Sequence, residues 1–250
     1  MQFDAFDRRM RGFEQVSEIP LLPEVWVVVR LEVRRFEAVR RELGFREPFD
    51  DSWMEALIET LQELTGLGIY LRYGHIQGPE LSVLLDSNER SFGRRGLKLA
   101  TTLAGVASSK LSVLLGRAIG FQATLSQLPD RLAVVDYFRW RMGLSERNAL
   151  NSLAYWALRR SGQDAAGATL HLDGMSGPEK LELLTASGTS FEEVSTWKRR
   201  GVGMHRSVRS HEGTDPRSGL PTVSKRIGWR IERDLPGEAS YSRFLSDQLV

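Results

Sequence analysis

Val25-Trp26-Val27-Val28-Val29-Arg30-Leu31-Glu32-Val33 is the stretch that decides the fold of this 250-residue chain. Its dense run of β-branched and apolar residues predicts a buried β-strand. The elements predicted after it are, in order, a helix over 51–64, strands over 69–76 and 81–85, a helix over 97–115 and a strand over 121–125. The order β-α-β-β-α-β predicts an α+β fold with a ferredoxin-like core, an antiparallel sheet that carries two helices on one face.

The rest of the chain is predicted to be mostly helical. Apolar residues at helical spacing indicate a short amphipathic helix over 4–15, and further helices are expected over 145–160, 163–170, 177–186 and 241–249. Residues 211–221 are rich in turn formers and predict a loop, and 224–231 predict a strand. We therefore expect a core domain over 1–135 and a helical, basic extension with a small β element over 136–250.

Composition narrows the class of protein. A hydrophobic fraction of 41% and a charged fraction of 26% are typical of a soluble globular chain. The absence of cysteine excludes disulfides and thiolate chemistry. No stretch reads as an export signal or a membrane span, so we expect a cytoplasmic protein without a membrane partner. Residues 131–233 hold 17 basic and 11 acidic residues, an excess of positive charge that favours an anionic partner.

Several stretches together resemble the tRNA-His guanylyltransferase superfamily, and most closely its bacterial and archaeal "like" branch, the 3′-to-5′ RNA polymerases. The resemblance is carried by Phe3–Arg11, Arg30–Phe36, Pro48-Phe49-Asp50, Tyr73–Ser82, Phe92-Gly93-Arg94-Arg95, Ser126-Gln127-Leu128-Pro129, Val135–Arg141, Arg147-Asn148-Ala149-Leu150-Asn151 and Lys198–Gly203. It implies a polymerase-palm-like core that adds nucleotides to RNA 5′ ends, using GTP or ATP and two Mg²⁺ ions held by hard oxygen ligands.

The metal site implied by the resemblance is altered. Glu32 stands where the family has its first aspartate, Val33 where it has a glycine whose carbonyl binds metal, and Pro79 where it has the second aspartate. Glu80 keeps an acid, but neighbouring strand residues point to opposite faces, so it cannot simply replace position 79. Glu32 and Glu80 are the remaining metal candidates of a degenerate site. No residue is assigned a catalytic role.

Basic and amide side chains provide the other candidates that the resemblance implies. Arg95 and Lys98 lie in the region that contacts the triphosphate. The RNA-binding candidates are Arg139, Arg141, Arg147, Asn148, Asn151, Lys198, Arg199 and Arg200. The alternative reading of the arginines and the lysine is a solvated face, and the two asparagines could instead cap a neighbouring loop. The family's His- and Asn-rich signature is missing, so specificity for tRNA-His is not implied.

Three functional hypotheses follow. The leading one is a catalytically degraded pseudoenzyme that serves as an RNA-binding or structural subunit, beside an active homologue and without a cofactor. The second is an active 3′-to-5′ nucleotidyltransferase that uses two Mg²⁺ ions and GTP or ATP on tRNA-like 5′ ends. The third is a protein whose partner is another protein, its RNA surface being a relic. The resemblance also implies a homo- or hetero-oligomer, and DNA is not expected as a partner.

Overall fold

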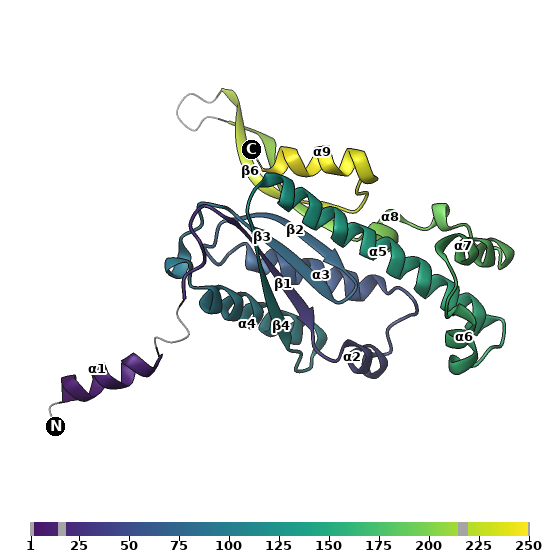
Figure 1. The fold of residues 1–250 in the computed structure, drawn as a ribbon. Coiled ribbons are helices and arrows are strands. Elements are labelled where there is room, and N and C mark those ends of the chain that lie inside the picture. Colours follow the sequence, from purple (N-terminus) through teal and green to yellow (C-terminus); the bar gives the residue numbers. More distant parts are fainter. Residues whose placement is uncertain (1–2, 15–18, 215–219, 250) are drawn as a thin grey trace. The chain divides into compact units, whose positions relative to one another are not determined.

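The computed structural model of the protein describes residues 3–14, 19–214 and 220–249. The fold is α+β, with a six-stranded antiparallel sheet in the order β4-β1-β3-β2-β5-β6 (Figure 1). The strands are β1 Trp26–Val33, β2 Leu71–Gln77, β3 Glu80–Leu85, β4 Phe121–Leu128, β5 Val202–Thr214 and β6 Pro221–Glu232. The helices are α1 Phe3–Glu14, α2 Phe36–Leu43, α3 Asp51–Leu64, α4 Gly96–Leu115, α5 Arg131–Arg160, α6 Ala165–Leu172, α7 Gly177–Ala186, α8 Thr196–Arg200 and α9 Glu238–Gln248, with 3-10 turns at Ser91–Arg94 and Phe191–Glu193.

The chain divides into two compact units. The first consists of residues 1–44, 52–71 and 79–134, and the second of residues 45–51, 72–78 and 135–250. No helix in the described ranges is long and apolar enough to cross a membrane.

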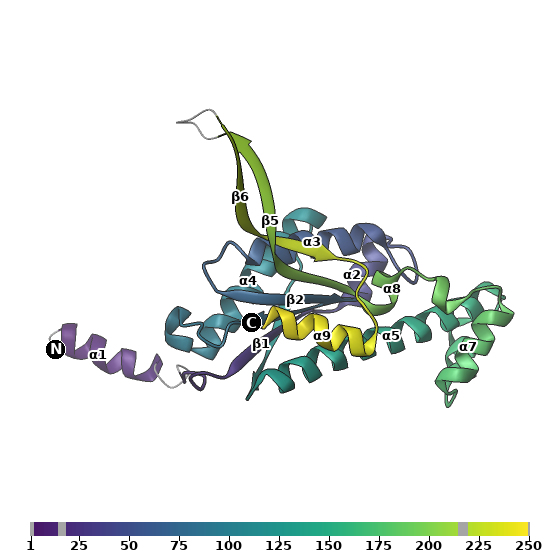
Figure 2. The same cartoon turned by 90° about the horizontal axis from the view of Figure 1, so that it is seen from above.

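The first unit is built around β1, which lies between β3 and β4. Val27, Val29 and Leu31 are buried, as their dense apolar pattern predicts. Helices α3 and α4 lie on the same side of β1 (Figure 2). Small residues in the middle of α4 allow close approach to β4, where the Ser108 hydroxyl accepts a hydrogen bond of 2.9 Å from the backbone N–H of Phe121. This packing holds the end of β1, where the metal candidates lie.

The second unit packs α5 and α9 on β2. The ring of Tyr73 on β2 meets Phe138 of α5 edge-on, with centroids 4.8 Å apart. Its hydroxyl lies 3.0 Å from that of Tyr241 on α9, and burial raises the pKa of both phenols. Strands β5 and β6 continue past β2 as a long two-stranded ribbon (Figure 2). Helices α6 and α7 lie near the end of α5, where Leu153, Ala154, Ala157 and Leu184 form an apolar cluster.

The structure corrects several sequence predictions at element boundaries. Helix α5 begins at Arg131, 14 residues before the predicted start, because Val134, Phe138 and Met142 recur at helical spacing and are buried. Helix α2, over Phe36–Leu43, is not among the helices predicted from the sequence. The loop prediction over 211–221 is wrong at both ends, which belong to β5 and β6, and its middle, 215–219, lies outside the described residues.

Candidate functional site

The two metal candidates lie opposite each other on adjacent strands. Glu32 of β1 is in register with Glu80 of β3. The Nη1 atom of Arg30 donates hydrogen bonds to Oε2 of Glu32 at 3.0 Å and to Oε1 of Glu80 at 2.8 Å. Arg30 and Glu32 are two residues apart on one strand and therefore share a face of the sheet. One guanidinium group thus bridges both carboxylates.

The bridge is partly shielded from solvent. The side chains of Arg30, Glu32 and Glu80 keep 24%, 36% and 18% of their surface exposed. A second donor, Nε2 of Gln122 on β4, reaches Oε2 of Glu32 at 3.1 Å. Hydrogen bonds to an ionised group are shorter and stronger than those between neutral groups, so Arg30 and Gln122 together fix the position of the Glu32 side chain.

Pro79 and Val33 are joined to each other by a backbone hydrogen bond beside the two acids. The carbonyl oxygen of Pro79 accepts a hydrogen bond of 3.0 Å from the N–H of Val33, and the Val33 side chain is buried. Pro79 follows Gly78 in the turn between β2 and β3, where Gly78 has a φ of 53°. Glu80 shares a face of the sheet with Glu32 because the two residues are partners in the register of β1 with β3, and whether Glu80 can replace position 79 stays a prediction.

These residues do not fit the two-metal centre that the resemblance implies. Mg²⁺ requires several hard oxygen ligands in a near-octahedral arrangement, and two such ions require converging carboxylates. Within residues 3–14, 19–214 and 220–249, no three His, Cys, Asp or Glu side chains gather in a way that could hold a metal ion. The donor set consists of two carboxylates that already share a cation, and Arg30 would repel a second one.

Arg94 lies in the segment just before α4, next to the nucleotide candidate Arg95. Arg94 is buried, and its guanidinium group donates to the carbonyl oxygens of Leu22, Val25, Ser87 and Glu89 at 2.8 to 3.1 Å. Arg94 therefore holds the surrounding loops together, a role that we did not predict. The sequence feature that could have indicated this role is the pair of adjacent arginines, Arg94 and Arg95, next to a predicted loop.

Arg95 and Lys98 stand at the start of α4. The Nε of Arg95 donates to the carbonyl oxygen of Phe92 at 2.8 Å, and Lys98 is exposed in the first turn of the helix. Unpaired N–H groups and the helix dipole make a helix N-terminus favourable for anions, and Lys98 adds a positive charge there. Their assignment to triphosphate binding stays a prediction.

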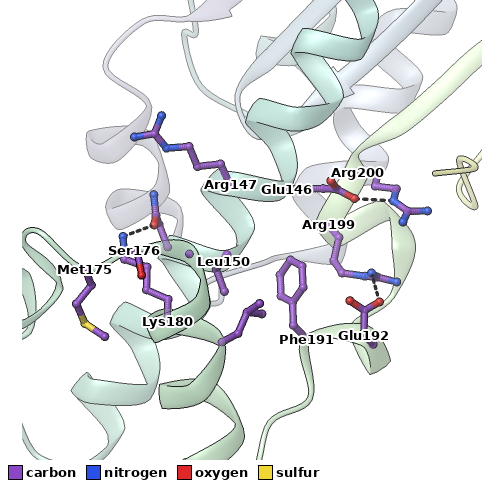
Figure 3. A pocket seen from close by; sticks show the side chains of 13 residues that line it. Glu146, Arg147, Leu150, Met175, Ser176, Lys180, Phe191, Glu192, Arg199 and Arg200 are labelled. Carbon is purple, nitrogen blue, oxygen red and sulfur yellow. Dashed lines mark hydrogen bonds and ion pairs between the residues drawn. The ribbon is translucent and has the colours of Figure 1, made fainter. Parts of the chain in front are cut away.

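The second unit carries a pocket of about 570 Å³ between α5, α7 and the segment 191–200 (Figure 3). Charged groups on its wall are largely paired. The Nε of Arg200 donates to Glu146 at 2.7 Å, Arg199 to Glu192 at 3.0 Å, and the Nζ of Lys180 to Oδ1 of Asn151 at 3.0 Å. Arg147 is exposed, points away from Glu146 and Arg200 (Figure 3), and has no partner among the residues that the structure describes.

The RNA candidates differ in how exposed they are. Arg141 and Arg199 are buried, and Arg199 also donates to the carbonyl oxygen of Val194 at 2.8 Å. The exposed candidates are Arg139, Arg147 and Asn148, and Lys198 is half-buried with its Nζ 5.2 Å from the centre of the Trp197 ring. Lys180 and Phe191, which also line the pocket, were missed because they lie in stretches without a basic or aromatic pattern.

His75 links β2 to the end of α8. Its Nε2–H donates to the carbonyl oxygen of Arg200 at 2.9 Å. Burial, with a contribution from the charge of Arg141, lowers the pKa of His75 to about 4 despite this hydrogen bond. Gly201 follows with a φ of 83°, and a Cβ there would lie 2.2 Å from the carbonyl oxygen of Ile76. The basic run 198–200 is thus anchored to β2 by its backbone.

Comparisons with known proteins agree on one family. Residues 7–136 match the family described as tRNAHis guanylyltransferase. A probable tRNA(His) guanylyltransferase of Drosophila melanogaster is 27% identical over 207 residues, which are 77% of this chain and 70% of that protein. The tRNA(His) guanylyltransferase of Debaryomyces hansenii is 26% identical, covering 88% of both chains.

Solved structures are similar in fold. A bacterial tRNA(His) guanylyltransferase-like protein in complex with ATP superposes with a TM-score of 0.78 at 19% identity, covering 98% of this chain and 99% of that one. The same kind of protein in complex with GTP gives a TM-score of 0.76 at 18% identity, with the same coverage. The tRNA(His) guanylyltransferase of Saccharomyces cerevisiae gives a TM-score of 0.71 at 22% identity, covering 78% of this chain and 90% of that one.

Proposed function

Because the chain belongs to the tRNAHis guanylyltransferase family, we propose that it is a member that has lost two-metal nucleotidyl transfer and retains an RNA-binding role. It works as an RNA-holding or structural subunit beside an active homologue, and it needs neither Mg²⁺ nor a nucleoside triphosphate for that role. Its core is the ferredoxin-like palm of that family. The strand order β4-β1-β3-β2, with α3 and α4 on one side of β1, supports this fold assignment.

The observation that carries the proposal is the bridge from Arg30 to Glu32 and Glu80. A two-metal site needs acidic oxygens that are free to bind cations and converge on one point. Here a guanidinium nitrogen lies within 3.0 Å of each remaining acid, and position 79 contributes a backbone carbonyl to β-sheet pairing. A divalent ion would have to displace an internal cation that is already hydrogen-bonded to both acids.

The RNA-binding part of the proposal rests on the exposed cations of the second unit. Arg147 on α5 is exposed and Lys198 on α8 is half-buried, and both are available to meet phosphate oxygens. Arg141 and Arg199 are buried and Arg200 is paired with Glu146, so they contribute to the structure around these cations. Among the eight predicted RNA residues, we therefore assign phosphate binding first to Arg147 and Lys198, because Arg139 is paired with Asp136 at 3.4 Å.

The first experiment tests the loss of catalysis. Isothermal titration calorimetry of the full chain with GTP or ATP in millimolar Mg²⁺ is expected to give no metal-dependent binding. Incubation with a 5′-truncated tRNA, nucleotides and Mg²⁺ is expected to give no extension, while an active family member under the same conditions extends it. Extension by the wild-type chain would overturn the proposal and support the alternative, an active 3′-to-5′ nucleotidyltransferase.

That alternative is favoured by one observation, the alignment of Glu32 with Glu80 on the same face of the sheet. If Arg30 moved aside when a nucleotide arrived, these two acids would converge. The variant Glu80→Gln discriminates between the two functions. It would abolish extension by an active enzyme, and it is expected to leave RNA binding unchanged in an RNA-holding protein.

The second experiment tests RNA binding by fluorescence anisotropy over a range of salt concentrations. Each phosphate contact contributes about 0.7 to 0.9 to the slope of log K against log salt, so Arg147→Ala and Lys198→Ala are each expected to lower the slope by about that amount. Lys110→Ala is the matched control, because this lysine is already close to Glu59 and Glu63. Undetectable RNA binding would point instead to a protein partner.

A further inference from the structure

A second pocket lies nearer the N-terminal end of α5 than the first one, and its lining does not suit a phosphate group. It has a volume of about 300 Å³. Its wall is formed by Asp136, Arg139, Trp140, Met142, Gly143 and Glu146 of α5, and by Glu238 at the start of α9. All of these residues belong to the second unit. The volume is sufficient for one planar heterocycle rather than for a folded peptide or a helix.

Trp140 is the feature of this pocket that points to a ligand. Its side chain is 54% exposed, although tryptophan has a large apolar surface that is usually covered. The indole is held in place by an edge-on contact with Tyr137, with centroids 5.6 Å apart, and by the guanidinium group of Arg141, 5.1 Å from the ring centre. A rigid, exposed indole beside a small pocket is a platform on which another flat ring can stack.

The charges in the pocket decide which part of a nucleotide can enter it. Three carboxylates, those of Asp136, Glu146 and Glu238, line it against the single guanidinium group of Arg139. Glu146 is engaged by Arg200 at 2.7 Å, and Asp136 lies 3.4 Å from Arg139. A phosphate would be repelled by this excess of negative charge, whereas a base that donates hydrogen bonds would be attracted.

The hydrogen-bonding groups of the pocket limit which base fits it. A carboxylate can accept two parallel hydrogen bonds, and guanine offers two adjacent donors on its Watson–Crick edge, the ring N–H and the exocyclic amino group. Arg139 can donate to the neighbouring carbonyl oxygen of the same base. Uracil offers a single donor between two acceptors, so it satisfies fewer of these groups. The base must be unpaired, because its Watson–Crick edge has to be free.

We propose that this pocket binds one unpaired guanine of the RNA, stacked on Trp140 with its donor edge toward Asp136 or Glu238. The inference rests on the proposed RNA-binding function and adds a base-reading site to it. Phosphates on either side of the extruded nucleotide remain available to exposed cations such as Arg147. The site thus gives the protein a preference for RNA with an unpaired guanine over RNA that is fully paired.

The test uses the full-length protein and RNA hairpins that carry a single unpaired G, A, U or C at one position. Anisotropy titrations are expected to show the tightest binding for G. Stacking of a base on an aromatic side chain contributes about 1 to 3 kcal/mol, so Trp140→Ala is expected to weaken binding of the G hairpin about 5- to 150-fold. Trp140→Phe keeps a stacking surface and is expected to recover most of that loss.

The acidic residues are tested through selectivity rather than affinity. Asp136→Asn combined with Glu238→Gln keeps the shape of the pocket but replaces one oxygen of each carboxylate by an NH2 donor, so that neither side chain can accept the two parallel hydrogen bonds that distinguish G from U. This double variant is expected to bind the G and U hairpins equally, whereas wild type prefers G. Leu132→Ala, which removes an exposed apolar side chain from the same helix, is the control and is expected to change neither affinity nor preference.

The outcomes separate this inference from the proposed function. If the wild type binds RNA but Trp140→Ala binds as tightly, the base site is refuted while the RNA-binding role stands. If the wild type shows no preference for G, or if the double acidic variant keeps it, the assignment of guanine is refuted. If the wild type binds no RNA at all, the proposed function itself fails. Circular dichroism of each variant verifies that it is folded.

Discussion

Replacing Arg30 by methionine is the most direct perturbation of the altered metal site. Methionine keeps much of the length of the arginine side chain but removes the charge and the donors that bridge Glu32 and Glu80. Arg34→Met is the matched control, since Arg34 is exposed just beyond the end of β1. We expect Arg30→Met to destabilise the protein and Arg34→Met to change its stability by less than about 0.5 kcal/mol.

The size of the expected destabilisation follows from the distances between Arg30 and the two carboxylates. Both carboxylates lie within 3.0 Å of the same nitrogen, so without Arg30 they face each other at a separation of at most about 6 Å. Repulsion between two such charges is about 3 kcal/mol at an effective dielectric constant of 20 and about 0.7 kcal/mol in water. Partial exposure of Glu32 lowers the figure, and we expect a loss of about 1 to 2 kcal/mol. For a chain of this length that corresponds to a decrease of about 2 to 8 °C in Tm.

The assay is urea or thermal unfolding at neutral pH and low salt. Arg30→Met combined with Glu80→Gln removes the repulsion and is expected to recover part of the lost stability. Millimolar Mn²⁺ is expected to raise the Tm of Arg30→Met more than that of the wild type, because the freed acids can then share a divalent ion. The reasoning is refuted if Arg30→Met is as stable as wild type, or if Glu80→Gln does not restore stability to it.

The remaining predictions concern the second unit. Gly201→Ala is expected to lower the free energy of unfolding by more than about 2 kcal/mol, because its Cβ would lie 2.2 Å from a backbone oxygen at a φ of 83°; an unchanged urea midpoint would contradict this. Tyr73→Phe is expected to cost about 1 to 2 kcal/mol because it leaves the buried Tyr241 hydroxyl without its partner, and adding Tyr241→Phe is expected to recover part of that loss in a double-mutant cycle. His75 is neutral in the folded protein down to a pKa of about 4 but titrates near 6.5 when unfolded, so its contribution is complete above pH 6.5 and falls as the pH drops toward 4. The loss between pH 7.5 and pH 5 is about 2 kcal/mol, and His75→Gln should show a flatter stability profile in urea titrations across that range.

Much of the first unit could be predicted from sequence because its signals are local. The β-branched run of β1 and the apolar spacing of α3 each specify one element, and both were found within two residues of their bounds. The start of α5 was missed because its residues 131–144 combine aromatic and β-branched side chains, which also suit a strand. Strand β6 was predicted over 224–231 and is confirmed, whereas β5 and its pairing with β6 were missed, because many residues of β5 are polar and pairing is a property of two strands together.

At the candidate site, too, residue identities could be read from the sequence but contacts between strands could not. From the sequence we predicted Glu32, Val33 and Pro79 as departures from the family pattern and Glu80 as an acid that is kept, since each residue identity can be read without coordinates. It did not reveal that Arg30 bridges two acids 48 positions apart, because that contact depends on the register of β1 with β3. Nor did it separate the buried Arg199 from the exposed Arg147, which look alike in a basic sequence.

The sequence by itself determined the family and the order of the core elements, because these depend on residue types and on spacings within single elements. Tertiary structure alone decided which charges are paired, which cations remain exposed, and that Trp140 stands beside a small acidic pocket. The physical reason is that the effect of a charge or an aromatic ring depends on its neighbours in space and on its exposure to water. Strand register and helix packing set both of these across long distances in the chain.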